Sequence, residues 1–155
     1  MSIPMKAALA NPAIAAALRK DSQRSIDAIQ KEAGPAPKGP ICFTVHGNPV
    51  SQNAMYRRAK QGKMFMSNEG VAWKKGVAAC AALAMNGRPL IEGPVTVRYR
   101  FYYGSLRSDV DASLKGTQDA LEGVVIADDK QIQTIVVEKK LDREKPRAYV
   151  EVQVL

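Results

Sequence analysis

The segment from Pro94 to Tyr103 constrains the fold more than any other part of the chain, because its side chains alternate in character. Every second position is apolar, which places one apolar face on an extended strand; these positions are Val95, Val97, Tyr99 and Phe101. The opposite face carries Arg98 and Arg100. The pattern therefore predicts a half-buried strand with a basic outer face.

The segments around this strand predict a domain that contains both helices and strands. Apolar spacing and end signals predict strands over residues 41–45, 132–138 and 148–155, a helix over about 67–86, and a second helix that Asp111 or Ser113 caps and that runs to about Glu122. Residues 50–66 have no stable period and are interpreted as a loop. The order is β-α-β-α-β-β, so we expect an α+β domain in which two helices pack on one small mixed sheet.

Residues 1–40 differ from the rest and predict an N-terminal helical extension. Asn11 and Pro12 are favourable at a helix start, and apolar residues then keep to one helical face as far as Ile29. Gly and Pro residues in 34–40 stop the helix and form a linker. We therefore divide the chain into this extension, residues 1–40, and a domain at 41–155. The sequence leaves open whether the helix docks on its own domain, pairs with a partner or frays.

Charge is distributed unevenly along this chain, whose net charge is +8. Residues 38–107 hold eleven Lys and Arg against two Glu, whereas residues 108–129 hold six Asp and Glu against one basic residue, Lys115. A basic body around one acidic spot suggests a polyanionic partner and a cation held by carboxylates. A solvated basic surface with an acidic helix start is the alternative.

The cysteines and the apolar runs indicate a compartment. Cys42 and Cys80 lie far apart without CxxC spacing, which is typical of thiols in a reducing compartment. No run approaches the ~18 apolar residues that span a bilayer, and the charges at residues 19–21 argue against a signal peptide. We expect a cytoplasmic protein with no membrane partner.

The acidic stretch has the chemistry of a metal site. Asp109 and Asp111 are two residues apart, so an extended backbone would direct both carboxylates to one face, where they suit Mg²⁺. Lys115 follows Asp111 by one helical turn and could stabilise charge that develops on a phosphate. Asp128 and Asp129 follow the predicted helix, and one of them could supply a further carboxylate to the metal. Each motif alone is common, as a capped turn or a plain turn, but their combination favours a metal site.

Candidate nucleic-acid contacts gather in the loop before the first long helix. Amide, aromatic and guanidinium groups interleaved in a loop suit contacts with phosphates and sugars. The candidates are Asn53, Tyr56, Arg57, Arg58, Lys60 and Lys63, together with Lys74 and Arg107 outside the loop. A solvated basic loop would look the same. Trp73 is interpreted as a core residue, and His46, the sole histidine, as a structural residue or a phosphate contact.

These motifs resemble those of RusA-type Holliday junction resolvases. The resemblance is carried by Asp109-Val-Asp111-Ala-Ser-Leu-Lys115, by Asp119-Ala-Leu121 and by Asp128-Asp129-Lys-Gln131. More loosely, it extends to 49–53, 56–57, 67–70 and 72–74, and it covers about residues 41–155. One departure is Ala112, which stands where the family usually has Asn. This departure would either reduce activity or be compensated by a neighbouring residue, such as Ser113, that takes the place of the Asn.

The resemblance implies a homodimeric, Mg²⁺-dependent endonuclease that nicks opposing strands of a four-way DNA junction, with Mn²⁺ as a possible substitute. It implies metal ligation by Asp109, Asp111 and Asp129, and catalysis by the same aspartates with Lys115. The connection from Leu121 to Asp128 is about a residue shorter than in the family, so Asp128 stays open as the third ligand.

Two other functions fit parts of the sequence. A protein that binds branched DNA without cleaving it would result if Ala112 weakens the metal site. A phosphotransferase of haloacid-dehalogenase type also uses a DxD motif. That family requires Thr or Val where this chain has Ser113, and the chain is too short for its sheet and cap. We therefore expect the endonuclease first and the binding protein second.

Overall fold

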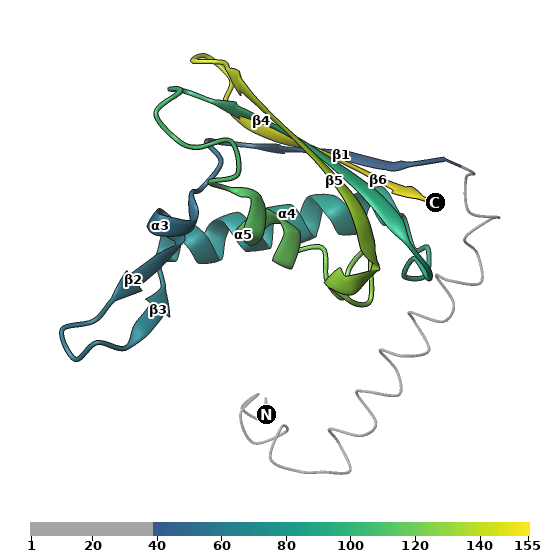
Figure 1. Cartoon of the computed structure of the whole chain (residues 1–155), viewed down its shortest axis with the longest axis horizontal. Helices are drawn as coiled ribbons and strands as arrows, with labels where there is room; N and C mark the ends of the chain where they lie inside the picture. The colour runs from purple at the N-terminus through teal and green to yellow at the C-terminus, as the bar shows by residue number, and fades with distance from the viewer. Residues whose placement is uncertain (1–38) are drawn as a thin grey trace, which may run out of the picture. The chain divides into compact units, whose positions relative to one another are not determined.

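The structure is a computed structural model that describes residues 39–155, and it centres on a four-stranded mixed sheet (Figure 1). The strands lie in the order β1-β6-β4-β5, and their bounds are Ile41–His46 for β1, Arg147–Val154 for β6, Val95–Tyr103 for β4 and Ile132–Leu141 for β5. Strand β6 pairs antiparallel with both β1 and β4, whereas β4 and β5 are parallel. The expected α+β class and mixed sheet are confirmed.

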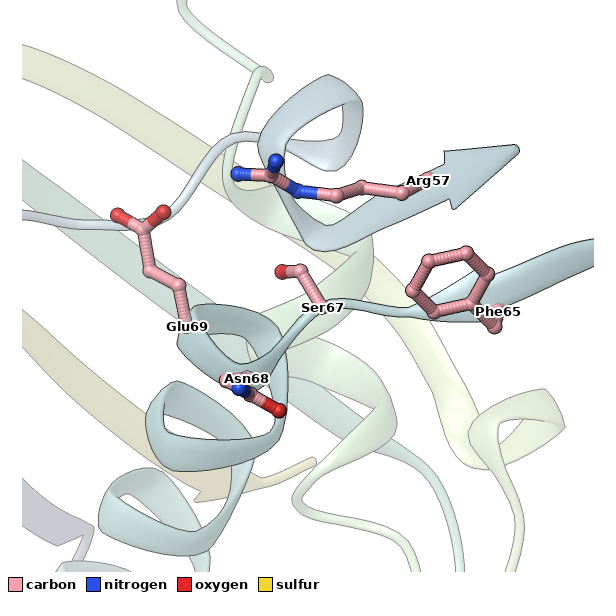
Figure 2. Close-up of a pocket in the computed structure, with 5 residues that line it drawn as sticks. All are labelled: Arg57, Phe65, Ser67, Asn68 and Glu69. Carbon is pink, nitrogen blue, oxygen red and sulfur yellow. The ribbon is translucent and has the colours of Figure 1, made fainter. Parts of the chain in front are cut away.

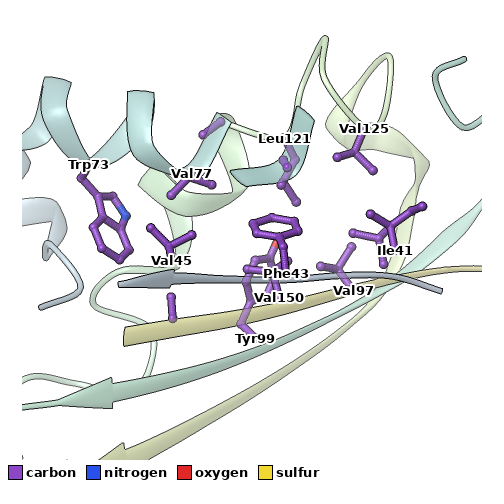
Figure 3. Close-up of a cluster of buried hydrophobic side chains, with 14 of the residues drawn as sticks. Ile41, Phe43, Val45, Trp73, Val77, Val97, Tyr99, Leu121, Val125 and Val150 are labelled. Carbon is purple, nitrogen blue, oxygen red and sulfur yellow. The ribbon is translucent and has the colours of Figure 1, made fainter. Parts of the chain in front are cut away.

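Two helices cover one face of this sheet, α4 (Asn68–Met85) and the shorter α5 (Leu114–Asp119) (Figure 1). Strand β4 alternates between buried and half-buried residues along its whole length, as expected for a two-faced strand. Its buried side joins Phe43, Val77, Leu121 and Val150 in one hydrophobic core between sheet and helices (Figure 3). Removal of this apolar surface from water is the main force that holds the two layers together.

The outer face of the sheet carries the basic residues that the alternation predicted. The Arg100 guanidinium pairs with the Glu138 carboxylate on β5 at 2.6 Å and lies over the Tyr149 ring, 5.4 Å from its centroid. Arg147 lies in the same way over Tyr102, at 3.8 Å. Arg100, one of the two arginines that the alternation predicted, is therefore partnered across the strands, and Glu138 balances its charge.

The loop expected over residues 50–66 is instead ordered structure, and this expectation is wrong. A four-residue helix, α3 (Gln52–Met55), leads into a hairpin of strands β2 (Tyr56–Arg58) and β3 (Met64–Met66). The strands pair antiparallel, and Gly62 at the tip has φ +81°, a conformation that favours glycine. The hairpin extends away from the sheet and helices (Figure 1).

Two boundaries also differ from expectation. The second helix ends at Asp119 rather than near Glu122, because Leu121 and Val124 onward form tight turns. Strand β5 continues to Leu141, since it pairs with β4 as far as Tyr103. The helix expected within residues 1–40 lies outside the described residues. No helix within residues 39–155 is long and apolar enough to cross a membrane.

Met55 of α3 joins three helices at one point. Its side chain is 1% exposed. A Cβ added at Gly70 of α4 would lie 2.7 Å from Met55 Cγ and 2.8 Å from its carbonyl oxygen, and one added at Gly116 of α5 would overlap the end of the same side chain. The two glycines therefore permit α3 to contact both α4 and α5, which fixes the base of the hairpin beside the acidic stretch.

This contact predicts opposite effects of alanine at two glycines of α4. Gly70→Ala should lower the free energy of unfolding by about 1–3 kcal/mol, because the new methyl group meets Met55 backbone atoms that cannot move aside. Gly76→Ala meets nothing closer than Val45 Cγ1 at 3.8 Å, so it should stabilise the helix by about 0.5–1 kcal/mol. Urea unfolding followed by Trp73 fluorescence measures both. Equal midpoints for the two variants would contradict the close approach.

Candidate active site

All the sequence-predicted carboxylates of the site lie in a single connection, residues 104–131, between β4 and β5. Parallel strands require such a crossover, because the chain must return to the starting edge before it can pair again. The connection contains a run of turns, α5, and a short 3₁₀ helix, η1 (Asp129–Gln131). The connection leaves β4 at one end of the sheet and enters β5 at the other, and the contact of Lys115 with Asp129 links α5 to the end of the acidic stretch.

Asp109 and Asp111 lie in consecutive turns rather than at an extended strand end. The Ala112 N–H donates to the Asp109 carbonyl at 3.2 Å, and the Leu114 N–H donates to that of Asp111 at 2.9 Å. The backbone step between them is therefore a turn, and the extended step that would direct both carboxylates to one face is absent. Both side chains are exposed, and neither makes a hydrogen bond or ion pair within residues 39–155. Their oxygens are free to bind a cation.

Lys115 contacts two carboxylates, and neither is that of Asp111. Its Nζ lies 2.5 Å from Asp119 Oδ1 and 3.8 Å from Asp129 Oδ2. The hydrogen bond with Asp119 is the main reason that the pKa of Lys115 is raised, so the side chain is a cation at neutral pH. Our site prediction missed Asp119, although its spacing of four residues from Lys115 is the usual signal for a helical ion pair.

Asp128 and Asp129 have different roles. Asp128 caps η1: its Oδ1 accepts from the Lys130 N–H at 2.9 Å, and this backbone hydrogen bond is the main cause that lowers its pKa. Gln131 completes the capping box, since its Oε1 accepts from the Asp128 N–H at 3.0 Å. Of the two aspartates, Asp129 is the one that lies near Lys115.

A chain of buried hydrogen bonds fixes α5 under the acidic turns. The Tyr103 hydroxyl donates to Ser113 Oγ at 2.9 Å, the Thr117 hydroxyl donates to the Ser113 carbonyl at 2.8 Å, and Trp73 Nε1 donates to Thr117 Oγ1 at 3.1 Å. Ser113 occupies the N-cap position of α5 without capping it through its side chain. The Ser113 side chain is fully buried. Trp73 is buried, as expected for a core residue.

The carboxylates of the candidate site are ligands of the kind that Mg²⁺ prefers, but their positions match a magnesium site only in part. Among residues 39–155, no three Asp, Glu, His or Cys side chains lie together as a metal cage. Mg²⁺ usually binds through one or two carboxylates and completes its shell with water and substrate phosphates. The exposed, unpaired oxygens of Asp109 and Asp111 fit that mode of binding. The free cysteines Cys42 and Cys80 offer no alternative site.

Five of the candidate DNA contacts lie on the hairpin, and four of them are cationic. Arg57, Arg58, Lys60 and Lys63 are all exposed there. The Arg57 side chain lines a hollow of about 400 Å³ with Phe65 and the start of α4 (Figure 2). Asn53 is exposed on α3, and the adjoining Gln52 N–H donates to the Ala112 carbonyl at 2.7 Å. This bond attaches the hairpin base to the acidic turns, whereas Tyr56 is half-buried.

The remaining basic candidates lie elsewhere. Lys74 is half-buried on α4, and Arg107 lines a hollow of about 460 Å³ together with Arg143. Lys139, which the sequence did not suggest, donates to the Ser108 carbonyl at 2.8 Å and so holds the loop that precedes Asp109. Its position in an irregular, half-exposed strand gave no signal for this role.

Comparison with known proteins gives two matches. Residues 46–153 match the family described as endodeoxyribonuclease RusA. The matched range includes the last residue of β1, the hairpin, both helices that pack on the sheet and the whole acidic connection. The chain is also 29% identical over 133 residues to an uncharacterized protein, YqaN, of Bacillus subtilis (strain 168). That alignment covers 71% of this chain and 93% of the relative.

The buried Tyr103–Ser113 bond predicts a measurable coupling. Tyr103→Phe and Ser113→Ala should each lower the free energy of unfolding by about 1–2 kcal/mol, because each leaves one buried hydroxyl unpaired. The double variant should lose less than the sum of the two, which urea unfolding of all four proteins measures. Tyr102→Phe, on the other face of the same strand, is the control and should change stability by less than about 0.5 kcal/mol. Fully additive effects would show that the bond does not form.

Proposed function

Because this chain belongs to the family of the endodeoxyribonuclease RusA, a family of Holliday junction resolvases, we propose that it resolves four-way DNA junctions by paired, symmetric nicks with Mg²⁺. This activity would serve DNA recombination and repair. The observation that carries the proposal is the position of Lys115 in the crossover, 3.8 Å from Asp129 and in the same connection as Asp109 and Asp111.

The proposed roles follow from the charge of each group. Asp109, Asp111 and Asp129 would hold the metal ion, and Asp129 is preferred to Asp128 because it lies 3.8 Å from Lys115 whereas Asp128 caps η1. When bound, Mg²⁺ would neutralise the scissile phosphate and lower the pKa of a water molecule. Lys115 is a cation, so its role is to stabilise negative charge on the phosphate rather than to accept a proton.

The substrate would be held by the basic surfaces beside the site. The hairpin is attached to the acidic turns through the Gln52–Ala112 bond and carries four exposed cations, which suits a DNA backbone that approaches the carboxylates. Asn53, Tyr56, Lys74 and Arg107 would add contacts around it. The scarcity of carboxylates over residues 38–107 removes the repulsion that phosphates would otherwise meet.

Two coordinated cuts require two active sites, which is the reason to propose a homodimer. One site nicks one strand at a time, and a four-way junction presents two equivalent strands. A two-fold symmetric dimer matches that symmetry. Residues 1–38 are a candidate assembly element, and their deletion, with molecular mass measured in solution, tests that role.

The proposal predicts that Asp111→Asn abolishes cleavage of a labelled synthetic four-way junction in Mg²⁺. The loss should be at least about 100-fold, since even residues that only support metal ligands contribute 10- to 100-fold. Glu144→Gln, the same change at an exposed position in the turn between β5 and β6, is the control and should cleave normally. Undiminished nicking by Asp111→Asn would disprove the assignment.

A second function, binding of branched DNA without cleavage, is favoured by two observations. Ala112 replaces the usual Asn, and no three metal-binding side chains lie together within residues 39–155. A gel shift of the junction without any product in Mg²⁺ or Mn²⁺ would establish this function instead.

The hairpin predicts the salt dependence of binding. Replacement of Arg58, Lys60 and Lys63 by Ala should weaken junction binding and make the slope of log K against log salt shallower by about 0.9 per lost phosphate contact. The control replaces three exposed lysines outside the hairpin, Lys130, Lys140 and Lys145, and so removes the same charge. Fluorescence anisotropy without metal measures both slopes. Equal changes would show that the hairpin is not a preferred contact.

A further inference from the structure

We infer that Asp119 is a positioning residue of the active site, which holds the Lys115 ammonium in place beside Asp129. The inference rests on the proposed function, because Lys115 matters only if a phosphate is cleaved. It assigns a role to a carboxylate that is neither one of the proposed metal ligands nor a DNA contact.

The geometry makes Asp119 the primary partner of Lys115. Its Oδ1 is 2.5 Å from Lys115 Nζ, a hydrogen-bonding distance, whereas Asp129 Oδ2 at 3.8 Å makes only an ion pair. Both Lys115 and Asp119 lie on α5, one turn apart, so the helix itself sets their separation. Lys115 is thus directed along the helix toward Asp119 and the start of η1, rather than back toward Asp111.

The two side chains differ in how firmly they are held. The Lys115 side chain is 54% exposed and the Asp119 side chain 22% exposed. Asp119 is followed by Ala120 and Leu121, which are buried in the core. The more buried carboxylate is therefore the fixed partner, and the flexible lysine end is the group that it restrains.

A buried phenol on the core side is influenced by the charge of this carboxylate. Tyr99 is fully buried on the core face of β4, and its hydroxyl has no hydrogen-bond partner within the described residues. Burial raises the pKa of Tyr99, and the negative charge of Asp119 raises it further. The Asp119 charge therefore acts on the edge of the core as well as on the exposed ammonium.

A purely stabilising role explains this arrangement poorly. An ion pair between residues four apart on an exposed helix surface contributes little to stability. The ion pair has a larger effect on the orientation of the Lys115 side chain, because a lysine has four rotatable bonds and its ammonium would otherwise sample many positions. Misplacement of a catalytic group by about 1 Å can cost about 100-fold in rate. We therefore expect Asp119 to affect the rate of catalysis more than the stability of the fold.

The test compares Asp119→Asn, Asp119→Glu and the control Glu122→Gln, which removes a neighbouring exposed charge that makes no hydrogen bond to Lys115. Asp119→Asn should lower kcat for junction cleavage about 10-fold or more, with KM and metal-free junction affinity within about twofold. Asp119→Glu, which keeps a carboxylate, should recover part of the rate. Glu122→Gln should cleave like the parent protein.

A second readout needs neither metal nor DNA. In lysine-selective NMR, the Lys115 ammonium signal should be observable in the parent protein and in Glu122→Gln. In Asp119→Asn it should be lost, because the ammonium protons exchange faster with water without the hydrogen bond to the carboxylate. Equal cleavage by Asp119→Asn, or an equal loss in Glu122→Gln, would overturn the positioning role. Failure of the parent protein to cleave would overturn the proposed function, and the inference with it. If Asp119→Asn does not fold, Asp119→Glu decides, because a positioning role requires a changed kcat at unchanged affinity.

Discussion

The arrangement of the candidate site depends on one buried hydrogen bond, from the Tyr103 hydroxyl to Ser113 Oγ. Tyr103 ends β4 and Ser113 begins α5, so the bond spans the turns that contain Asp109 and Asp111. The side chains of Tyr103 and Ser113 are almost completely buried. Leaving either hydroxyl without a hydrogen-bond partner there would lower the stability of the fold. The bond continues through Thr117 to Trp73 on α4, which ties the second helix to the first. The exposed carboxylates are thus carried by turns whose two ends are fixed from inside.

The sequence predicted the two-layer fold because its main signals are local. Alternation over β4 and the apolar stripe of α4 each occupy a continuous segment, and each requires burial against the other. The hairpin escaped prediction because β2 and β3 are three residues each, too short to show a period. Its order comes from contacts distant in sequence, above all the packing of Gly70 and Gly116 on Met55. No composition rule identifies such a contact in advance.

For the site, residue types were easier to predict than their partners. A lysine among carboxylates pointed to phosphate chemistry, and the structure does place Lys115 near Asp129. The sequence did not show that Lys115 extends toward Asp119 or that Asp109 and Asp111 lie in turns, since spacing alone does not fix backbone conformation between a strand and a helix. The sequence also did not distinguish Asp128 from Asp129, whose surroundings differ in the structure: Asp128 caps η1, and Asp129 lies near Lys115.

The strand order has a consequence for the timing of assembly. Strand β6 follows all the other strands in sequence, yet it lies between β1 and β4 in the sheet. Strand β1 therefore has no neighbour until β6 has been inserted, and the sheet cannot close progressively from one end of the chain to the other. Such long-range pairing is slow compared with local structure formation. Strands β4 and β5, which flank the acidic connection, are paired with each other directly, so this half of the sheet does not depend on β6 in the way that β1 does.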